Sequence, residues 1–372
     1  MARPKAELTR AGGDIGERLS ERLAAIDAEG LRRSLRPPSG IDLCSNDYLG
    51  LAEHPLLKRR MAEAVLAEGV GSTGSRLLRG ERAGFSLVEE HFARFKHTER
   101  SLYFSSGYLA NLAVLTTFPE AGDVIFSDAH NHASLIDGAR LSRARCVIFP
   151  HNDVAALKLL LAEDAGAEQK FVVVESLFSM DGDEAPLTEY RALCREAGAQ
   201  LIVDEAHAVG VYGEHGDGLA GEVFVTINTA GKAMGVAGAF VAGSGDAIEY
   251  LIQRARTFIF STAPPPAIAA ALNASLEVIA SEPERRERLR ARARYLRRKL
   301  GLDGDSPIIP IIIGDNERAV AVARELQAAG FDVRAIRPPT VPPGTARLRI
   351  AVNQGLSEQI LDQFVTALEH AT

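Results

Sequence analysis

The sequence contains few cysteines and no long apolar run. No apolar stretch reaches the roughly 18 residues that a membrane-spanning helix needs, so we expect no transmembrane segment and no membrane partner. The three cysteines, Cys44, Cys146 and Cys194, are odd in number and irregularly spaced, which argues against a disulfide framework and indicates a reducing compartment. No apolar segment follows the opening MARPKAELTR, so we expect no secretory signal. These absences favour a cytoplasmic protein.

The sequence also lacks an excess of positive charge. Its 372 residues carry a net charge of -7, and the 42 lysines and arginines are scattered along the chain. The densest basic run, residues 285–299, alternates with apolar residues at helical spacing and is interpreted as a solvated helix face. The charge therefore gives no indication of a nucleic-acid partner. With 46% hydrophobic and 24% charged residues, the composition is that of a globular enzyme with room for two domains.

Seven short apolar runs alternate with helical patterns through the middle of the chain. This alternation predicts an α/β fold, a mostly parallel seven-stranded sheet with helices on both faces. The expected strands are residues 101–104, 124–126, 146–149, 171–175, 201–204, 223–227 and 239–242. We expect an N-terminal helical segment (1–45), a large domain (46–270) and a smaller C-terminal α+β domain (271–372). An amphipathic helix is expected over residues 12–36, and a long helical region over residues 268–300.

A glycine-rich stretch at residues 69–74, GVGSTG, matches the dinucleotide-binding fingerprint G-x-G-x-x-G. That fingerprint needs a preceding strand, whereas residues 55–68 have a helical pattern. We therefore reject a dinucleotide-binding dehydrogenase. The stretch is interpreted as a tight loop that approaches a ligand or a partner subunit.

A lysine with small apolar neighbours follows the expected strand at 223–227. Lys232 lies between Gly231 and Ala233, with Gly235 close behind. An amine in such surroundings loses some of its preference for the charged form and so becomes the nucleophile that a Schiff base requires. The alternative is a surface lysine in a β-turn, since lysines are mostly exposed.

A carboxylate and an imidazole precede this lysine in the chain. Asp204 ends the strand at 201–204, where open α/β sheets place ligand contacts, and His207 follows one turn later. An aspartate that faces a pyridine nitrogen keeps it protonated, which makes pyridoxal phosphate (PLP) an electron sink. The presence of Asp204 therefore argues against Lys232 being a simple surface residue.

The pattern strand-Asp204-x-x-His207, followed by Thr229-x-Gly-Lys232, resembles the α-oxoamine synthases, a family of fold-type I PLP enzymes. The resemblance covers nearly the whole chain, and makes the large domain the PLP-binding one. It implies that Lys232 forms the Schiff base with PLP, that Asp204 faces the ring nitrogen and that His207 hydrogen-bonds the ring hydroxyl. It also implies a homodimer with active sites at the subunit interface.

Other stretches indicate where the cofactor binds. The segment SSGYLAN (105–111) opens a helix, and its start at Gly107 and Tyr108 can offer free N–H groups to a phosphate, although a plain strand-to-helix turn is the alternative. Thr229 can donate its hydroxyl to a phosphate. The resemblance implies that Ser179, in the loop ESLFSMDGD, also contacts the cofactor.

The resemblance further implies that Ser261 and Thr262 reach the partner subunit's site near the phosphate.

The cluster Asp128-x-His130-x-His132 allows two interpretations. It can be a metal site, because alternate residues of a strand end share one face, but no further ligand set is evident and zinc requires one. It can also supply an imidazole that stacks on a cofactor ring. The resemblance implies the second role for His132 and a structural role for His130, and we expect no metal.

The most specific stretch is IRPPTVPPGTARLRI at residues 336–350. Arg347 and Arg349 face the same side of an expected strand, and a guanidinium can clamp a substrate carboxylate bidentately. By the resemblance, Arg349 holds the substrate carboxylate, Thr340 lies near the substrate, and Arg347 is structural. It also implies that Asn46, in SNDYLGL, contacts the substrate and that Arg32 lies near its acyl group.

The proline-rich sequence of residues 336–350 resembles most the family member that condenses L-alanine with a pimeloyl thioester. The expected activity is PLP-dependent acyl transfer with decarboxylation, giving 8-amino-7-oxononanoate, carbon dioxide and a free thiol in biotin biosynthesis. Coenzyme A and acyl carrier protein both stay open as the carrier. The alternatives are a sister enzyme that uses glycine or serine, such as glycine C-acetyltransferase, and a non-catalytic subunit, against which the intact Lys232, Asp204, His207 and His132 argue.

Overall fold

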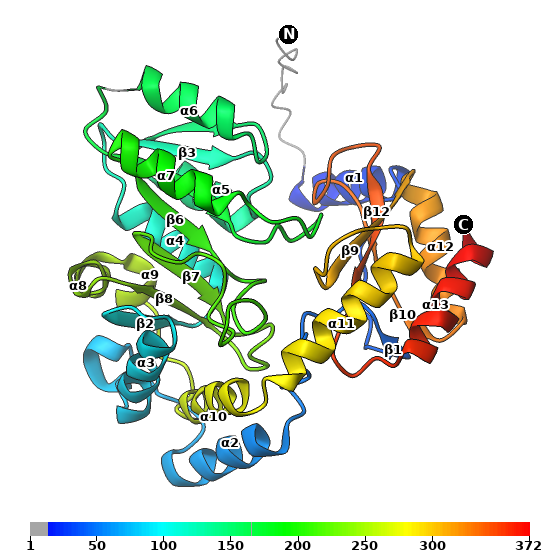
Figure 1. Cartoon of the computed structure of the whole chain (residues 1–372), viewed down its shortest axis with the longest axis horizontal. Coiled ribbons are helices and arrows are strands. Elements are labelled where there is room, and N and C mark those ends of the chain that lie inside the picture. The colour runs from blue at the N-terminus through cyan, green and yellow to red at the C-terminus, as the bar shows by residue number, and fades with distance from the viewer. Residues whose placement is uncertain (1–13, 165) are drawn as a thin grey trace. The chain divides into compact units, whose positions relative to one another are not determined.

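The computed structural model describes residues 14–164 and 166–372, which divide into two compact units (Figure 1). The large unit comprises residues 43–310 and 350–366. The small unit comprises the described residues up to 42 together with residues 311–349 and 367–372. The segment MARPKAELTR, on which the expected absence of a secretory signal depends, lies outside the described residues.

This division differs from the three parts expected from the sequence. β1 (Ile41–Asp42) pairs in parallel with β10 (Phe331–Asp332), so the N-terminal segment joins C-terminal residues instead of forming a body of its own. Residues 271–310 belong to the large unit. They do so because α10 (Ala267–Ser281) packs against α2 (Pro55–Glu68) and α3 (Ala83–Phe95).

The large unit is built on a seven-stranded sheet, which confirms the predicted fold class. The strand order is β2-β8-β7-β6-β5-β3-β4, and each strand overlaps one of the expected apolar runs. β8 is antiparallel to both of its neighbours, whereas the other pairs are parallel. The bounds are β2 (Arg100–Phe104), β3 (Val124–Asp128), β4 (Arg145–Phe149), β5 (Lys170–Glu175), β6 (Gln200–Asp204), β7 (Val225–Thr229) and β8 (Ala239–Gly243).

Each face of this sheet is covered by helices and encloses its own hydrophobic core. On β5, Val173 faces the core beneath α4, α5, α8 and α9, whereas Val172 and Val174 face the core beneath α6 and α7. Burial on both faces explains why the strands read as continuous apolar runs. The helices are α4 (Gly107–Thr117), α5 (Ala133–Leu141), α6 (Val154–Glu163), α7 (Leu187–Ala197), α8 (Gly245–Arg254) and α9 (Arg256–Ile259).

One predicted helix is shorter in the structure, and the predicted helical region is interrupted. Residues 268–300 contain two helices, α10 and α11 (Glu284–Lys299), because Pro283 lacks the N–H that would continue α10. α1 (Ile15–Ala28) ends well before residue 36, since Gly30 has a φ of +65°, in the left-handed region that terminates helices. Residues 12 and 13 of that predicted helix lie outside the described part.

A second sheet has three strands, in the order β11 (Ala335–Ile336), β12 (Ala346–Ala351) and β9 (Ile308–Gly314). α12 (Asn316–Ala328) packs on β10 and β11 within the small unit. The remaining elements are α13 (Glu358–Ala371) and, in the large unit, the short helical turn η1 (Arg76–Gly80). Within residues 14–164 and 166–372, no helix has both the length and the apolar character that crossing a membrane requires.

The turn between β7 and β8 carries Lys232 and is fixed by backbone hydrogen bonds. The Ala230 N–H donates to the Gly238 carbonyl, and the Gly235 N–H donates to the Lys232 carbonyl, both at 2.8 Å. Gly235 has a φ of +68°, and a Cβ at this position would lie 2.5 Å from the backbone nitrogen of Ala52. The turn therefore requires glycine at position 235.

We predict that Gly235→Ala lowers the melting temperature of the protein. The left-handed backbone alone costs an alanine about 1–2 kcal/mol, and the approach to Ala52 adds to this. Gly231→Ala is the matched control, because its Cβ would meet only the Thr229 Cγ2 atom, at 4.0 Å. Thermal unfolding of both variants tests the prediction, and equal melting temperatures would contradict it.

Candidate active site

Polar residues gather where three adjacent parallel strands of the large unit end. Glu175 is the last residue of β5 and pairs with Asp204, the last residue of β6. Thr229 ends the neighbouring β7, and Lys232 follows in the next turn. The carboxyl ends of parallel strands are the edge at which open α/β sheets bind ligands. The fold thus brings together residues that are far apart in the sequence.

A chain of hydrogen bonds fixes the amine of Lys232. Its Nζ atom lies 2.8 Å from Nε2 of His207, whose Nδ1 atom lies 2.7 Å from the hydroxyl of Tyr48. The Tyr48 hydroxyl donates to Oδ1 of Asn46 at 3.1 Å. Since that hydroxyl has one proton to give, it accepts from the Nδ1–H of His207, which leaves Nε2 as an acceptor for the lysine amine.

Tyr48 belongs to this series of hydrogen bonds, but the sequence analysis did not identify it as a site residue. Its side chain is fully buried, and its ring lies at 6.1 Å from that of His207 between centroids. The sequence SNDYLGL pointed to Asn46, a neighbour in the same turn. A tyrosine beside a residue that is predicted to contact the substrate is a signal, but its link to His207 depends on tertiary structure.

Asp204 is buried and held by two hydrogen bonds. Its Oδ2 atom accepts from Nδ2 of Asn111 at 2.7 Å, and its Oδ1 atom accepts from the backbone N–H of Ala206 at 2.9 Å. Asn111 also donates to Oγ of Ser134 at 2.8 Å, and that hydroxyl lies 2.7 Å from Nδ1 of His132. One polar network therefore links the carboxylate to the imidazole.

The electrostatic setting of His132 favours its neutral form. Burial lowers the pKa of the imidazole, and the Lys232 ammonium acts in the same direction, while Asp204 opposes both. A neutral imidazole with an exposed face suits stacking on an aromatic ring better than a charged one. Asn111 and Ser134, which orient it, were not identified from the sequence, because polar residues inside helices carry no distinctive pattern.

Glu175 is a second buried carboxyl, next to Asp204, and it too was missed. Burial raises its pKa to about 8, and the charge of Asp204 adds to this, while Lys232 and the backbone N–H groups of His132 and Ser179 oppose it. Its Oε1 atom has no hydrogen-bond partner within the described structure. Because it binds the backbones of His132 and Ser179, Glu175 joins two segments predicted to contact the cofactor.

The start of α4 forms a cradle for a small anion. Ser106 caps the helix by accepting the N–H of Leu109 at 3.2 Å, which leaves the earlier N–H groups available. A Cβ at Gly107 would lie only 2.6 Å from Oγ1 of Thr229, so a side chain there would fill the space between them. Tyr108 is 41% exposed and hydrogen-bonds Asp137.

These residues fit PLP. Free N–H groups and a hydroxyl beside Gly107 suit its phosphate, an amine suits its carbonyl carbon, and a buried aspartate suits its ring nitrogen. The unpartnered Oε1 of Glu175 and Oδ1 of Asn111 leave polar atoms unsatisfied, as expected beside a ligand. The donor set thus matches each end of the cofactor.

The residues of the Asp128-x-His130-x-His132 cluster do not converge on one centre. Asp128 accepts from Nδ1 of His151 at 2.8 Å, and the His130 ring stacks on that of His151 with centroids 4.0 Å apart. His132 turns instead toward Ser134. Residues 14–164 and 166–372 contain no group of three or more His, Cys, Asp or Glu side chains arranged to hold a metal.

His151 instead joins two loops at this edge of the sheet. Its Nε2 atom lies 2.7 Å from Oδ2 of Asp183, opposite the contact to Asp128. Burial disfavours the charged imidazole, but the hydrogen bonds to both aspartates outweigh it and raise the pKa of His151 to about 10. The imidazolium holds together the end of β3 and the loop that carries Ser179.

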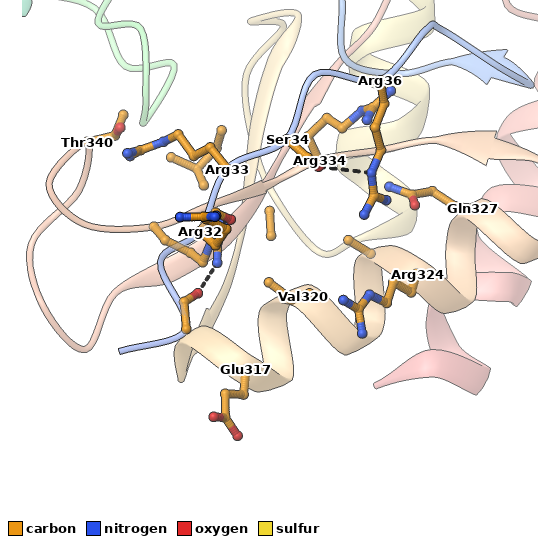
Figure 2. A pocket seen from close by; sticks show the side chains of 15 residues that line it. Arg32, Arg33, Ser34, Arg36, Glu317, Val320, Arg324, Gln327, Arg334 and Thr340 are labelled. Carbon is orange, nitrogen blue, oxygen red and sulfur yellow. Dashed lines mark hydrogen bonds between the residues drawn. The ribbon is translucent and has the colours of Figure 1, made fainter. Parts of the chain in front are cut away.

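The remaining predicted residues lie elsewhere in the chain. Ser261 and Thr262 follow α9, where the Ser261 N–H donates to the Phe258 carbonyl at 3.4 Å. Arg349 is buried on β12, and Arg32 and Thr340 line a cavity of the small unit (Figure 2). Their roles toward substrate stay predictions.

We predict that Glu175→Gln removes part of the pH dependence of stability. Between the ordinary pKa of 4.5 and about 8, the unfolded chain releases the Glu175 proton while the folded protein keeps it, so the free energy of unfolding falls as pH rises. The slope from one group is at most about 1.4 kcal/mol per pH unit. Glutamine is neutral at every pH, so the variant should lose stability less steeply over that window.

Melting temperatures of the cofactor-free protein across the window test this. Glu189→Gln, which removes an exposed carboxyl on α7, should keep the wild-type slope. A Glu175→Gln profile parallel to that of the wild type would show that Glu175 is already ionised at low pH.

Comparison with known proteins shows to which family the chain is related. Residues 38–368 match the family described as aminotransferase class I and II. A curated relative from Geobacter sulfurreducens named 8-amino-7-oxononanoate synthase is 45% identical, covering 93% of this chain and 95% of the relative.

Two solved structures are also similar. Serine palmitoyltransferase from S. paucimobilis, with a PLP–myriocin aldimine bound, is 29% identical with a TM-score of 0.89, covering 96% of this chain and 98% of that one. An 8-amino-7-oxononanoate synthase from Francisella tularensis is 29% identical with a TM-score of 0.78, covering 89% and 97%. This chain belongs to the aminotransferase class I and II family, and the 8-amino-7-oxononanoate synthases are among its relatives.

Proposed function

We propose that the protein is a PLP-dependent acyltransferase that condenses L-alanine with a pimeloyl thioester. The products are 8-amino-7-oxononanoate, carbon dioxide and a free thiol, in a step of biotin biosynthesis. The observation that carries the proposal is the arrangement of Lys232, His207 and Asp204 at the ends of β6 and β7. Curated relatives at 42–47% identity with the corresponding name support this choice of substrates.

The proposed roles of the residues follow from their chemistry. When bound, PLP withdraws electrons from the substrate Cα and so stabilises negative charge there. Lys232 would hold the cofactor through its amine, and its Nζ would serve as the base that takes the Cα proton of the substrate. Asp204 would keep a proton on the ring nitrogen, and His207, oriented by Tyr48, would hydrogen-bond the ring hydroxyl. His132 would stack on the ring face.

The binding residues divide between the cofactor and the substrates. Gly107, Tyr108 and Thr229 are proposed to bind the phosphate, together with Ser261 and Thr262 of the other subunit in a homodimer. Ser179 is proposed to contact the cofactor near Glu175. Arg349 is proposed to orient the alanine carboxylate, with Thr340, Asn46 and Arg32 near the substrates.

The proposed partners and cellular location rest on the family resemblance, the cysteines and the net charge. The homodimer is supported by the family resemblance of the segment after α9, and a cytoplasmic location by three cysteines present as thiols. A net charge of -7 supports the absence of a nucleic-acid partner.

A sister reaction is the second candidate. Serine palmitoyltransferase structures match with TM-scores up to 0.89, higher than the 0.78 of the 8-amino-7-oxononanoate synthase. An amino acid other than alanine is therefore a defined alternative, which a comparison of amino acids can decide.

We predict that added PLP gives a visible absorbance band that L-alanine perturbs at lower concentration than glycine or serine. The band reports cofactor linked to Lys232. Lys232→Ala should bind PLP without this band and lower turnover by roughly 100- to 10,000-fold, since it lacks the base. Lys158→Ala, an exposed lysine on α6, is the control and should behave as the wild type.

If glycine or serine perturbs the band at lower concentration than L-alanine, the sister reaction is favoured. Full turnover by Lys232→Ala would contradict the assignment of the lysine, and a wild type that acquires no band with PLP would favour a non-catalytic subunit.

A further inference from the structure

Two loops at the carboxyl ends of β3 and β5 carry residues that are proposed to contact PLP. The first loop, residues 128–132, leads from β3 to His132 at the start of α5. The second loop, residues 176–185, follows β5 and carries Ser179. Both belong to the large unit. The fit of the cofactor between these residues therefore depends on how the two loops are held with respect to each other.

The first loop is fixed to the sheet. Asn131 is buried, and its Nδ2 atom donates to the Val173 carbonyl of β5 at 2.7 Å and to the hydroxyl of Ser127 at 2.9 Å. The Oδ1 atom of Asp128 accepts the N–H of His130 at 2.8 Å, which fixes the turn that follows the strand. This loop is therefore a rigid support for its neighbour.

The second loop is closed on itself by backbone contacts. The Phe178 N–H donates to the Asp183 carbonyl, and the Gly182 N–H donates to the Phe178 carbonyl, both at 2.9 Å. Leu177 and Glu184 form an isolated antiparallel β-bridge. These contacts define the shape of the second loop, but they do not attach it to the first.

His151, which follows β4, attaches the second loop to the first. Its Nδ1 atom lies 2.8 Å from Oδ1 of Asp128, and its Nε2 atom lies 2.7 Å from Oδ2 of Asp183. Carboxylate oxygens only accept hydrogen bonds, so both ring nitrogens carry protons and the ring is an imidazolium. Asn152 strengthens the link, because its backbone N–H donates to Asp128 at 2.9 Å and its Nδ2 atom donates to Asp183 at 2.8 Å.

A second imidazole extends this bridge between the loops. The ring of His130 stacks on that of His151 with centroids 4.0 Å apart, and its Nδ1 atom lies 3.6 Å from Oδ2 of Asp181. The intervening Gly182 lies against residue 308, since a Cβ at this glycine would be 2.3 Å from the Ile308 carbonyl oxygen. The turn at residues 181–183 is therefore held by neighbouring segments along its whole length.

We propose that His151 is a positioning residue that sets the affinity and the orientation of PLP by holding the loop of Ser179 against the loop of His132. This inference rests on the cofactor contacts proposed above for Ser179 and His132, through which His151 acts. Glu175 also joins the backbones of His132 and Ser179, so removal of His151 leaves one link between the two loops in place. The loops should then loosen without loss of the fold.

The test is the binding of PLP to the full-length protein freed of cofactor, followed by the visible absorbance band and its circular dichroism. His151→Phe keeps a flat ring but removes both hydrogen bonds and the charge. The dissociation constant for PLP should rise at least about tenfold, the effect of one lost hydrogen bond to a charged group. The circular dichroism of the bound cofactor should change, because the ring is held at a different angle.

His91→Phe is the matched control. It removes a partly buried imidazole whose Nδ1 atom lies 2.6 Å from Oδ1 of Asn273, a contact between α3 and α10. This variant should bind PLP with the dissociation constant and the circular dichroism of the wild type. Melting temperatures of the cofactor-free variants show how much each substitution lowers stability.

A second substitution tests whether His151 acts through the loop of Ser179. Asp183→Asn removes a charge but keeps an oxygen that can accept both hydrogen bonds. It should raise the dissociation constant for PLP by about two- to tenfold. The double variant should bind PLP no more weakly than His151→Phe alone, because the two side chains share one contact. Additive losses would overturn the proposed link, and if His151→Phe does not fold, unchanged binding by Asp183→Asn would overturn it.

The outcomes separate this inference from the proposed function. If the wild type binds PLP and both His151→Phe and Asp183→Asn bind it equally well with the same circular dichroism, the role of His151 is wrong and the reaction stands. If His91→Phe weakens binding as much as His151→Phe, the effect is a general loss of stability, and the role is again wrong. If the wild type binds no PLP, the proposed function itself fails.

Discussion

The site depends on one constraint: parallel strands bring their carboxyl ends to the same edge of a sheet. β6 delivers Asp204 to this edge, and β7 leads into the turn of Lys232. His207, one turn beyond Asp204, accepts a hydrogen bond from the lysine amine at 2.8 Å. Tyr48 then fixes the other ring nitrogen of the imidazole. The lysine is thus positioned by the sheet and by side chains from two other parts of the sequence.

Two buried carboxyl groups at this edge of the sheet, Asp204 and Glu175, have different surroundings. Asp204 receives hydrogen bonds from Asn111 and from the backbone N–H of Ala206. Glu175, on the next strand, is raised to a pKa of about 8 and so keeps its proton at neutral pH. The two neighbouring carboxyl groups therefore differ in their surroundings: hydrogen-bond donors hold Asp204, whereas Glu175 is a neutral link between the segments of His132 and Ser179.

The sequence was sufficient to predict the fold and some of the residues that gather at the strand ends. All seven strands of the large sheet were predicted, because burial on both faces leaves an apolar signature. Lys232 and Asp204 were predicted because their chemistry is distinctive at those positions. Glu175 and Tyr48 were missed because their roles depend on neighbours in space. The helical region over residues 268–300 was predicted as well, but its interruption at Pro283 was not.

A cavity of the small unit that is lined by six arginines differs from the lysine site in how it can be recognised. Arg36 and Arg324 are nearly three hundred positions apart in the chain, yet both line the same cavity of the small unit. Scattered basic residues therefore concealed a local excess of charge in an acidic chain. Net charge alone describes the average surface and gives no information on such a site.

The fate of the alanine carboxyl carbon tests the central claim most directly. The protein would be incubated with PLP, a pimeloyl thioester and L-alanine labelled at that carbon, and the carbon dioxide and product would be analysed by mass spectrometry. The account predicts one labelled carbon dioxide for each molecule of 8-amino-7-oxononanoate, and none of the label in the product. Label retained in the product, or acyl transfer without carbon dioxide, would contradict it.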